Sequence, residues 1–259
     1  MDVQEELNHQ QVLSLLQKGK RADGRQKMEY REIEIEKNPL QNAEGSAICR
    51  MGKTQVIAGI KIDLATPFPD RPNEGVLSTG AEFTPLGSPH FEPGPPRVEA
   101  IEVARVVDRA VRSAEAIDLK SMSIEGSEKV IATYIDLWVI DHDGNLFDAG
   151  LMAAMAALKN TRMPKIEDGK IMRNEIAGKL DIKNNATSCT FAKYGEQFLL
   201  DPDFVEQSGA EGAITIATTP ESMCSGQKTG AAGFTQRNIM ELLDISFEQS
   251  ANLRKIIEG

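Results

Sequence analysis

Residues 45–62 read Gly-Ser-Ala-Ile-Cys-Arg-Met-Gly-Lys-Thr-Gln-Val-Ile-Ala-Gly-Ile-Lys-Ile, and this stretch decides the fold class. Two β-like runs, Gly45 to Cys49 and Gln55 to Ile62, lie on either side of the turn sequence Met51-Gly52-Lys53. Runs of this length around a glycine turn are typical of neighbouring strands. Glu32-Ile-Glu-Ile-Glu36 alternates strictly just before them. The sequence therefore predicts a small sheet joined by tight turns.

Helical patterns are expected around this sheet. Apolar residues recur at helical spacing from Glu5 to Lys18 and from Val98 to Ala116. A strand over Lys129 to Ile140 is followed by a turn at residues 141–145 and an alanine-rich helix from Ala149 to Lys159. Residues 66–96 hold eight of the twelve prolines, so most of this stretch is expected to be ordered loop around one regular piece, Val76 to Phe83.

The second half of the chain repeats the order of strands before a helix. After a polar connector at Lys159 to Lys170, we expect strands near Leu180 to Ile182, Ala186 to Lys193, Gln197 to Leu200 and Ala213 to Thr218, and a closing helix over Thr235 to Ile257. The fold class is α+β, with two βα halves packed together. The expected division is an N-terminal helix over 1–20, a first half over 21–165 and a second half over 166–259.

Composition excludes several classes of protein. The chain of 259 residues is 41% hydrophobic and can bury a large core. Its three cysteines lack CxxC spacing and its three histidines are scattered, so we expect neither a metal site nor a cofactor nor histidine-based catalysis. No apolar run is long enough for a membrane span and the start lacks the pattern of a secretion signal, so we expect a cytoplasmic protein without membrane contact.

The net charge is −10, with a pI near 5.0. This sign is unfavourable for a protein that would bind nucleic acid with its whole surface. Any contact with RNA is expected to be local, or to be shared with a more basic partner.

One basic stripe could make such a local contact. Arg105, Arg109 and Arg112 are spaced by four and three residues and share one face of the predicted helix. Planar guanidinium groups suit phosphate oxygens because they donate two parallel hydrogen bonds. The alternative is a solvated face whose arginines pair with Glu102, Asp108 and Glu115, which is the commoner arrangement on an isolated helix.

Three other motifs predict no binding site. Gly52-Lys53-Thr54 lacks the earlier glycine of a phosphate loop and precedes a strand. Residues 141–145, Asp-His-Asp-Gly-Asn, resemble the start of a calcium loop but lack its glutamate, and a helix-capping turn is the better interpretation. The glycine-rich residues 225–233 are expected to be a flexible connection before the last helix.

Four further motifs resemble the RNase PH superfamily: Arg21-Ala-Asp-Gly-Arg25, Glu44-Gly-Ser-Ala47, Gly52-Lys-Thr-Gln-Val56 and Phe91-Glu-Pro-Gly-Pro-Pro96. Glu102-Val-Ala-Arg-Val-Val-Asp-Arg109 and the stretch from Asp141 to Ala149 are similar to the archaeal exosome subunit that lacks its own active site. The resemblance extends from about Arg21 to Ile256 and keeps the motifs in order.

The resemblance implies an RNase PH fold and a place in a hexameric ring. In that ring the subunit alternates with a catalytic RNase PH-like homologue as a trimer of heterodimers, with RNA-binding cap subunits. Active homologues degrade single-stranded RNA from its 3′ end by attack of phosphate. The resemblance also brings the arginine stripe to the RNA cleft, which makes Arg105, Arg109 and Arg112 the predicted RNA-binding residues; Arg97 remains open.

The sequence departs from the active family members at three positions. Gln207 and Ala213 align with two aspartates, and Phe147 aligns with a phosphate-binding arginine. One charged group of this kind can contribute roughly 3 to 4 kcal/mol to transition-state stabilisation. We therefore expect a non-catalytic subunit that positions RNA. The alternatives are a phosphorolytic exoribonuclease that uses Asp201, Asp203 or Glu211, and a scaffold that binds proteins and no RNA.

Overall fold

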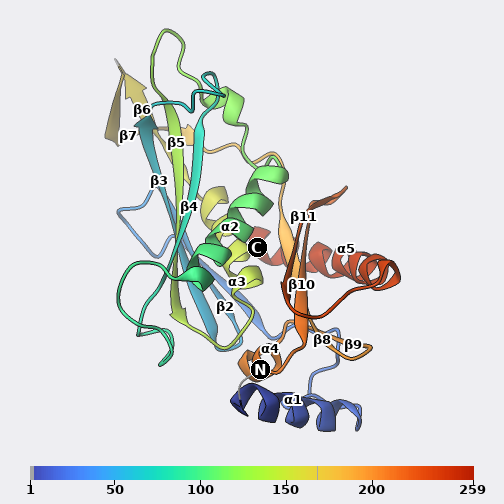
Figure 1. Cartoon of the computed structure of the whole chain (residues 1–259). Helices are drawn as coiled ribbons and strands as arrows, with labels where there is room; N and C mark the ends of the chain where they lie inside the picture. Colours follow the sequence, from blue (N-terminus) through green and yellow to red (C-terminus); the bar gives the residue numbers. More distant parts are fainter. Residues whose placement is uncertain (1–2, 168) are drawn as a thin grey trace.

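The computed structural model describes residues 3–167 and 169–259. Residues 1 and 2 of the expected N-terminal segment and residue 168 of the expected connector lie outside the described residues. Helix α1 (Val3–Leu16) comes first, and a segment without regular structure leads to the first sheet. Helices and strands both form the core, as expected for the α+β class (Figure 1).

The first sheet has five strands in the order β1-β2-β3-β5-β4. They are β1 (Ile33–Lys37), β2 (Gly45–Met51), β3 (Thr54–Ala65), β4 (Val76–Phe83) and β5 (Val130–Asp141). From Thr54 to Asp63 of β3 the residues alternate between buried and half-buried positions, which explains why this stretch predicts a strand. β4 runs parallel to β5, and the chain between them passes through α2 (Val98–Ser113) and a short 3-10 helix, η1 (Leu119–Met122).

The second sheet has four strands in the order β11-β10-β8-β9. They are β8 (Thr187–Tyr194), β9 (Gln197–Leu200), β10 (Gly212–Thr218) and β11 (Met223–Gly230), with α4 (Phe204–Ser208) between β9 and β10. The chain ends in α5 (Gln236–Glu258), which packs on β8 and β10.

Helix α3 (Leu146–Lys159) joins the two halves (Figure 1). Its residues from Ala149 to Leu158 are all buried, because it packs on β2 and β3 on one side and on β8 and α5 on the other. Small alanine side chains allow this close approach from both sides. One continuous hydrophobic core therefore contains residues of both halves.

Three expectations for the second half were wrong. The predicted connector at Lys159 to Lys170 contains β6 (Arg162–Glu167), which forms a hairpin with β7 (Lys170–Lys179). Residues 180–182 make only an isolated bridge, Ile117 to Ile182, in place of the predicted strand. The glycine-rich residues 225–230 belong to β11, paired along its length with β10. The errors at the connector and at residues 225–230 have one cause: β7 and β11 are largely exposed and polar, so backbone pairing stabilises them without a hydrophobic pattern.

A buried polar cluster ties the segment before β1 to the second half. Arg21 forms an ion pair of 2.6 Å with Glu206 and donates to the Leu200 carbonyl. Arg31 pairs with Asp201 at 2.7 Å, and Arg25 reaches the same carboxylate at 3.0 Å. Burial raises the pKa of Asp201, but the hydrogen bonds and charge of Arg31, together with a hydrogen bond from Asn145, lower it below its ordinary value. The Arg21-to-Arg25 motif therefore has a structural role here.

The turn before α3 meets the second half closely. Gly144 has φ of +84°, and a Cβ there would lie 2.5 Å from the Pro202 carbonyl oxygen. Asn145 caps α3 in the left-handed region without a side-chain cap bond. Its backbone N–H instead donates to Gln207 Oε1 at 2.8 Å. The turn interpretation is confirmed, but its contacts come from α4.

Candidate nucleic-acid interface

Helix α2 exposes the predicted arginine stripe. Its buried face carries Val103, Val107, Ala110 and Val111, which pack into the main core. On the other side Arg105 and Arg109 are exposed, and Arg112 is half-buried. Seven residues of helix, about 10 Å, separate the first arginine from the last. The structure therefore presents the three guanidiniums along one face.

The three arginines differ in how strongly they are engaged. Arg112 donates two hydrogen bonds to the Asp108 carboxylate, at 3.0 and 3.1 Å, and one to the Leu77 carbonyl at 2.9 Å. Arg109 donates to Gln227 Oε1 at 3.1 Å. Arg105 has no ion pair or hydrogen bond with any residue that the structure describes. Arg105 thus has the guanidinium most accessible to a ligand, and Arg112 the least.

A cleft of about 200 Å³ lies beside the first turns of α2. It is lined by residues of both halves: Phe83, Phe91, Glu99, Glu102, Val103, His142, Leu146, Phe147, Gln207 and Thr229. Phe147 and Gln207, two of the positions that depart from active family members, face this one cleft. The third, Ala213, is paired with Thr229 across β10 and β11, so its side chain lies on the same face of the sheet.

The described lining of this cleft includes no lysine or arginine. Glu99 and Glu102 contribute carboxylates, and Phe147 contributes a ring. The only titratable base in it is His142, whose pKa is lowered to about 4 by burial, with a smaller effect from Arg31. His142 is therefore neutral near pH 7. A phosphate ion in this cleft would meet two carboxylates and no charged donor from its lining.

Aromatic rings fix one wall of the cleft. The Phe91 ring lies tilted against Phe83 with ring centroids 4.7 Å apart, and it stacks on His142 at 5.4 Å. Phe204 of α4 meets the edge of His142 at 5.4 Å. The His142 backbone N–H also donates to the Gly87 carbonyl at 2.9 Å. These contacts hold the proline-rich loop against both halves, as expected for an ordered loop.

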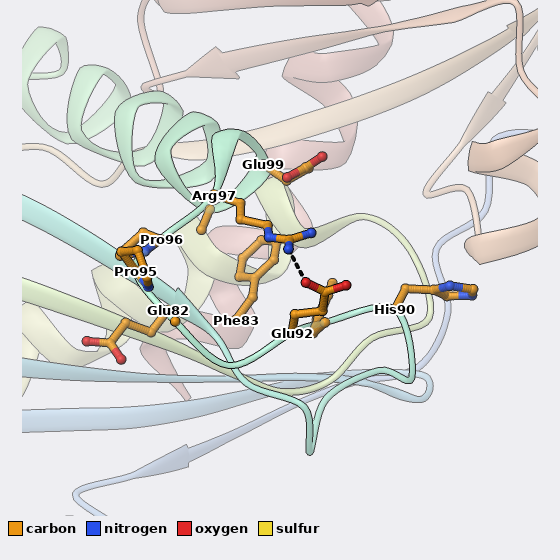
Figure 2. Close-up of a pocket in the computed structure, with 11 residues that line it drawn as sticks. Glu82, Phe83, His90, Glu92, Pro95, Pro96, Arg97 and Glu99 are labelled. Atoms are coloured by element: carbon orange, nitrogen blue, oxygen red, sulfur yellow. Dashed lines mark hydrogen bonds and ion pairs between the residues drawn. The ribbon is translucent and has the colours of Figure 1, made fainter.

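A second hollow of about 230 Å³ adjoins the first turn of α2. Glu82, Glu92 and Glu99 surround a floor that includes Phe83, and Figure 2 shows the Arg97 guanidinium turned toward the Glu92 carboxylate. That pair is a hydrogen-bonded ion pair. Arg97, which the sequence leaves open, is therefore partnered by a carboxylate of its own loop.

The alternative carboxylates have structural partners. Asp201 is fully buried among Arg25, Arg31 and Asn145. Asp203 caps α4, accepting from the Glu206 N–H at 2.9 Å. Glu211 accepts from the Gly195 N–H at 2.8 Å. Within residues 3–167 and 169–259, no group of three or more His, Cys, Asp or Glu side chains is placed to hold a metal ion.

Two models of one protein family match this chain, one in each half. The model for the 3′ exoribonuclease family, domain 1, matches residues 29–164, and the model for domain 2 of the same family matches residues 184–249. The chain belongs to the 3′ exoribonuclease family. The resemblance to the RNase PH superfamily and the fold class are thereby confirmed.

Full-length relatives in this family are exosome proteins by name. The chain is 43% identical over 251 residues to the Exosome complex component Rrp42 of Thermococcus gammatolerans, covering 95% of this chain and 92% of that protein. Among solved structures it is similar to a chain of the Archaeoglobus fulgidus exosome with RNA bound to the active site, with a TM-score of 0.91, 39% identity and coverage of 98% and 99%. An archaeal exosome core gives a TM-score of 0.87 at 36% identity, with 98% of each chain covered.

One residue of the candidate interface, Gln227, could not be predicted from the sequence. Gln227 lies in β11, which the glycine-rich pattern assigns to a flexible connection, yet its side chain contacts α2. Half-buried and exposed residues alternate strictly from residue 225 to residue 230 of this strand, but none of these residues is strongly apolar. A pattern of hydrophobic residues therefore offers no signal for it.

No helix among the described residues combines the length and apolar character needed to cross a membrane.

Proposed function

We propose that this chain is a non-catalytic subunit of an exosome ring, which binds single-stranded RNA and positions it for 3′-to-5′ phosphorolysis by a catalytic family member. The full-length similarity to Rrp42 proteins, and to chains of solved archaeal exosomes, supports membership of such a complex. One of those structures has RNA bound to its active site by description.

The observation that carries the non-catalytic part is the chemistry of the cleft beside α2. Phosphorolysis requires a site that neutralises phosphate and the charge that develops on it. Here the family positions hold Phe147, Gln207 and Ala213, and the remaining acidic groups of the lining, Glu99 and Glu102, repel an anion. The neutral His142 cannot compensate at pH 7. The cleft therefore favours a role in positioning over catalysis.

RNA contact is assigned to the stripe of Arg105, Arg109 and Arg112. Arg105 and Arg109 are exposed, so an incoming phosphate can displace water from them at little cost. Arg112 would have to share its guanidinium with Asp108 and contributes less. A local contact of this kind is compatible with a net charge of −10, because only a few phosphates are bound by this subunit.

The proposed assembly is a hexamer in which this chain and the catalytic RNase PH-like subunit alternate as a trimer of heterodimers. RNA-binding cap subunits complete it, and the cytoplasm is its proposed location. The division of the chain into segments 1–20, 21–165 and 166–259 belongs to the same proposal.

The second candidate is an intrinsically active phosphorolytic exoribonuclease. It would need Asp201, Asp203 or Glu211 as catalytic carboxylates. Each of them is engaged in the hydrogen bonds that stabilise the fold around α4 and the start of the chain. These contacts count against the enzyme hypothesis. A scaffold without RNA contact is disfavoured by the exposed guanidinium of Arg105, which has no partner among the described residues, since an exposed arginine stripe suits phosphates.

The deciding experiment measures phosphate-dependent release of nucleoside diphosphates from single-stranded RNA. The purified chain is tested alone, the catalytic family member of the same organism is tested alone, and the two are tested together. No release by this chain alone, with a rate for the mixture above that of the catalytic subunit alone, is the expected result. Robust turnover by this chain alone would establish the enzyme hypothesis instead.

A further inference from the structure

Gln227 of β11 bridges two charged residues of α2. Its amide oxygen accepts from the Arg109 guanidinium at 3.1 Å, and its amide nitrogen donates to Glu102 Oε1 at 2.8 Å. β11 runs beside α2 in the fold (Figure 1), and Gln227 is half-buried between them. One neutral side chain thus satisfies a cation and an anion that lie two turns apart on the same helix.

Without this bridge the charges on α2 would rearrange. Glu102 and Arg105 are three residues apart, which is the spacing at which opposite charges on a helix pair. Such a pair would neutralise the one guanidinium of the stripe that is unpartnered among the described residues. By holding the Glu102 carboxylate toward β11, Gln227 keeps it away from Arg105.

The effect on Arg109 is different in kind. Its guanidinium is oriented by an amide oxygen, which carries no net charge, so its positive charge remains available to a phosphate. A carboxylate at position 227 would orient the same guanidinium but would also neutralise it. The neutrality of the residue at 227 is therefore what the stripe requires.

We propose that Gln227 is a positioning residue for RNA binding, which orients Arg109 and withholds Glu102 from Arg105. This inference rests on the proposed function, since it assumes that the two exposed arginines bind phosphates. It goes beyond that function by assigning the availability of the stripe to a residue of the second half of the chain.

The test is the affinity for a labelled single-stranded RNA as a function of salt, measured on the full chain assembled with the catalytic family member. Gln227→Glu is the main variant. Gln41→Glu is its matched control, because it adds the same charge to an exposed loop beside Trp138, on the sheet face opposite α2. Thermal melting of each variant, followed by circular dichroism, shows whether the fold is retained.

Neutralisation of Arg109 alone is expected to make Gln227→Glu weaken RNA binding about fivefold at 0.1 M monovalent salt, because one phosphate contact to a single strand releases about 0.7 of a counterion. Release of Glu102 onto Arg105 should weaken binding further. The slope of log K against log salt is expected to become shallower by about 0.7 for each phosphate contact that is lost. A purely structural role for Gln227 would leave that slope unchanged. Gln41→Glu should change neither quantity.

A second pair of variants keeps the test informative if Gln227→Glu disturbs β11. Gln227→Ala releases Glu102, so it should weaken binding, and adding Glu102→Gln should restore most of the loss because no carboxylate is left to pair with Arg105. Failure of Glu102→Gln to rescue would contradict the proposed route through Glu102.

Two further arms separate this inference from the proposed function. Arg105→Ala and Arg109→Ala should each weaken binding, and in a background that carries both of these substitutions Gln227→Glu should have little further effect. If the arginine variants weaken binding but Gln227→Glu behaves like Gln41→Glu, the positioning role is refuted and the RNA contact stands. If neither arginine variant weakens binding, the RNA contact itself is refuted.

Discussion

Replacing His142 by phenylalanine should remove a pH dependence of stability that the wall of the cleft creates. His142 is half-buried and contacts the rings of Phe91 and Phe204, and this partial burial lowers its pKa from 6.5 to about 4. Phenylalanine keeps the ring in the stack but cannot bind a proton. The weak hydrogen bond from the Gly144 N–H to His142 Nδ1, at 3.4 Å, is lost equally at every pH.

The direction of this pH dependence follows from the lowered pKa of His142. The unfolded chain binds a proton at His142 below about pH 6.5, whereas the folded chain resists protonation until about pH 4. The stabilising contribution of the neutral ring is therefore complete above pH 6.5 and declines as the pH falls toward 4. From these two pKa values, the contribution lost between about pH 7.5 and about pH 4.5 is about 2.5 kcal/mol.

Subtraction isolates this contribution from others in the same window. Burial raises the pKa of Asp148 to about 6, so its protonation stabilises the fold as the pH falls and opposes the effect of His142. The unfolding free energies of the native chain and of His142→Phe are measured by urea denaturation at several pH values. Their difference cancels Asp148 and should fall by about 2.5 kcal/mol. A difference that stays constant with pH would refute the buried neutral histidine and the cation-free cleft built on it.

Three shorter predictions concern the stripe, the polar cluster and the packing of α3. Arg105→Glu or Arg109→Glu should weaken RNA binding and RNA degradation by the assembled ring, measured by fluorescence anisotropy and by product release. Size-exclusion chromatography should show that the ring remains intact. Unchanged RNA binding by both variants would show that the arginine stripe does not bind RNA. Asp201→Ala leaves buried guanidiniums unpaired and should lower the free energy of unfolding by about 3 to 5 kcal/mol, which lowers the melting temperature by roughly 6 to 20 °C. The control is Asp70→Ala, which removes an exposed carboxylate. A similar melting temperature for both variants would disprove the role of the polar cluster. Gly45→Ala would place a Cβ 2.5 Å from a backbone oxygen of α3 and should destabilise the chain by about 1 to 3 kcal/mol in urea denaturation. A urea midpoint equal to that of the native chain would show that α3 can shift to make room.

The sequence by itself determines those helices and strands in which the pattern of apolar side chains shows which face is buried. β3 is predicted from Gln55 to Ile62 and observed from Thr54 to Ala65, because alternate residues face the core. α2 is predicted from Val98 to Ala116 and observed from Val98 to Ser113, with its arginines opposite the apolar face. The family resemblance, carried by short motifs in the right order, is likewise readable from the sequence.

Features that arise from contacts between distant segments, namely β11, the cleft and the Gln227 bridge, are decided only by the tertiary structure. β11 is held by backbone hydrogen bonds to β10, and such bonds are available to any residue except proline, so the polar sequence of residues 223–230 does not reveal them. The cleft combines residues from 83 to 229, and its lack of a cation depends on which of them face inward. Gln227 meets Arg109 across 118 positions of sequence, and no local pattern encodes an encounter that long-range packing produces.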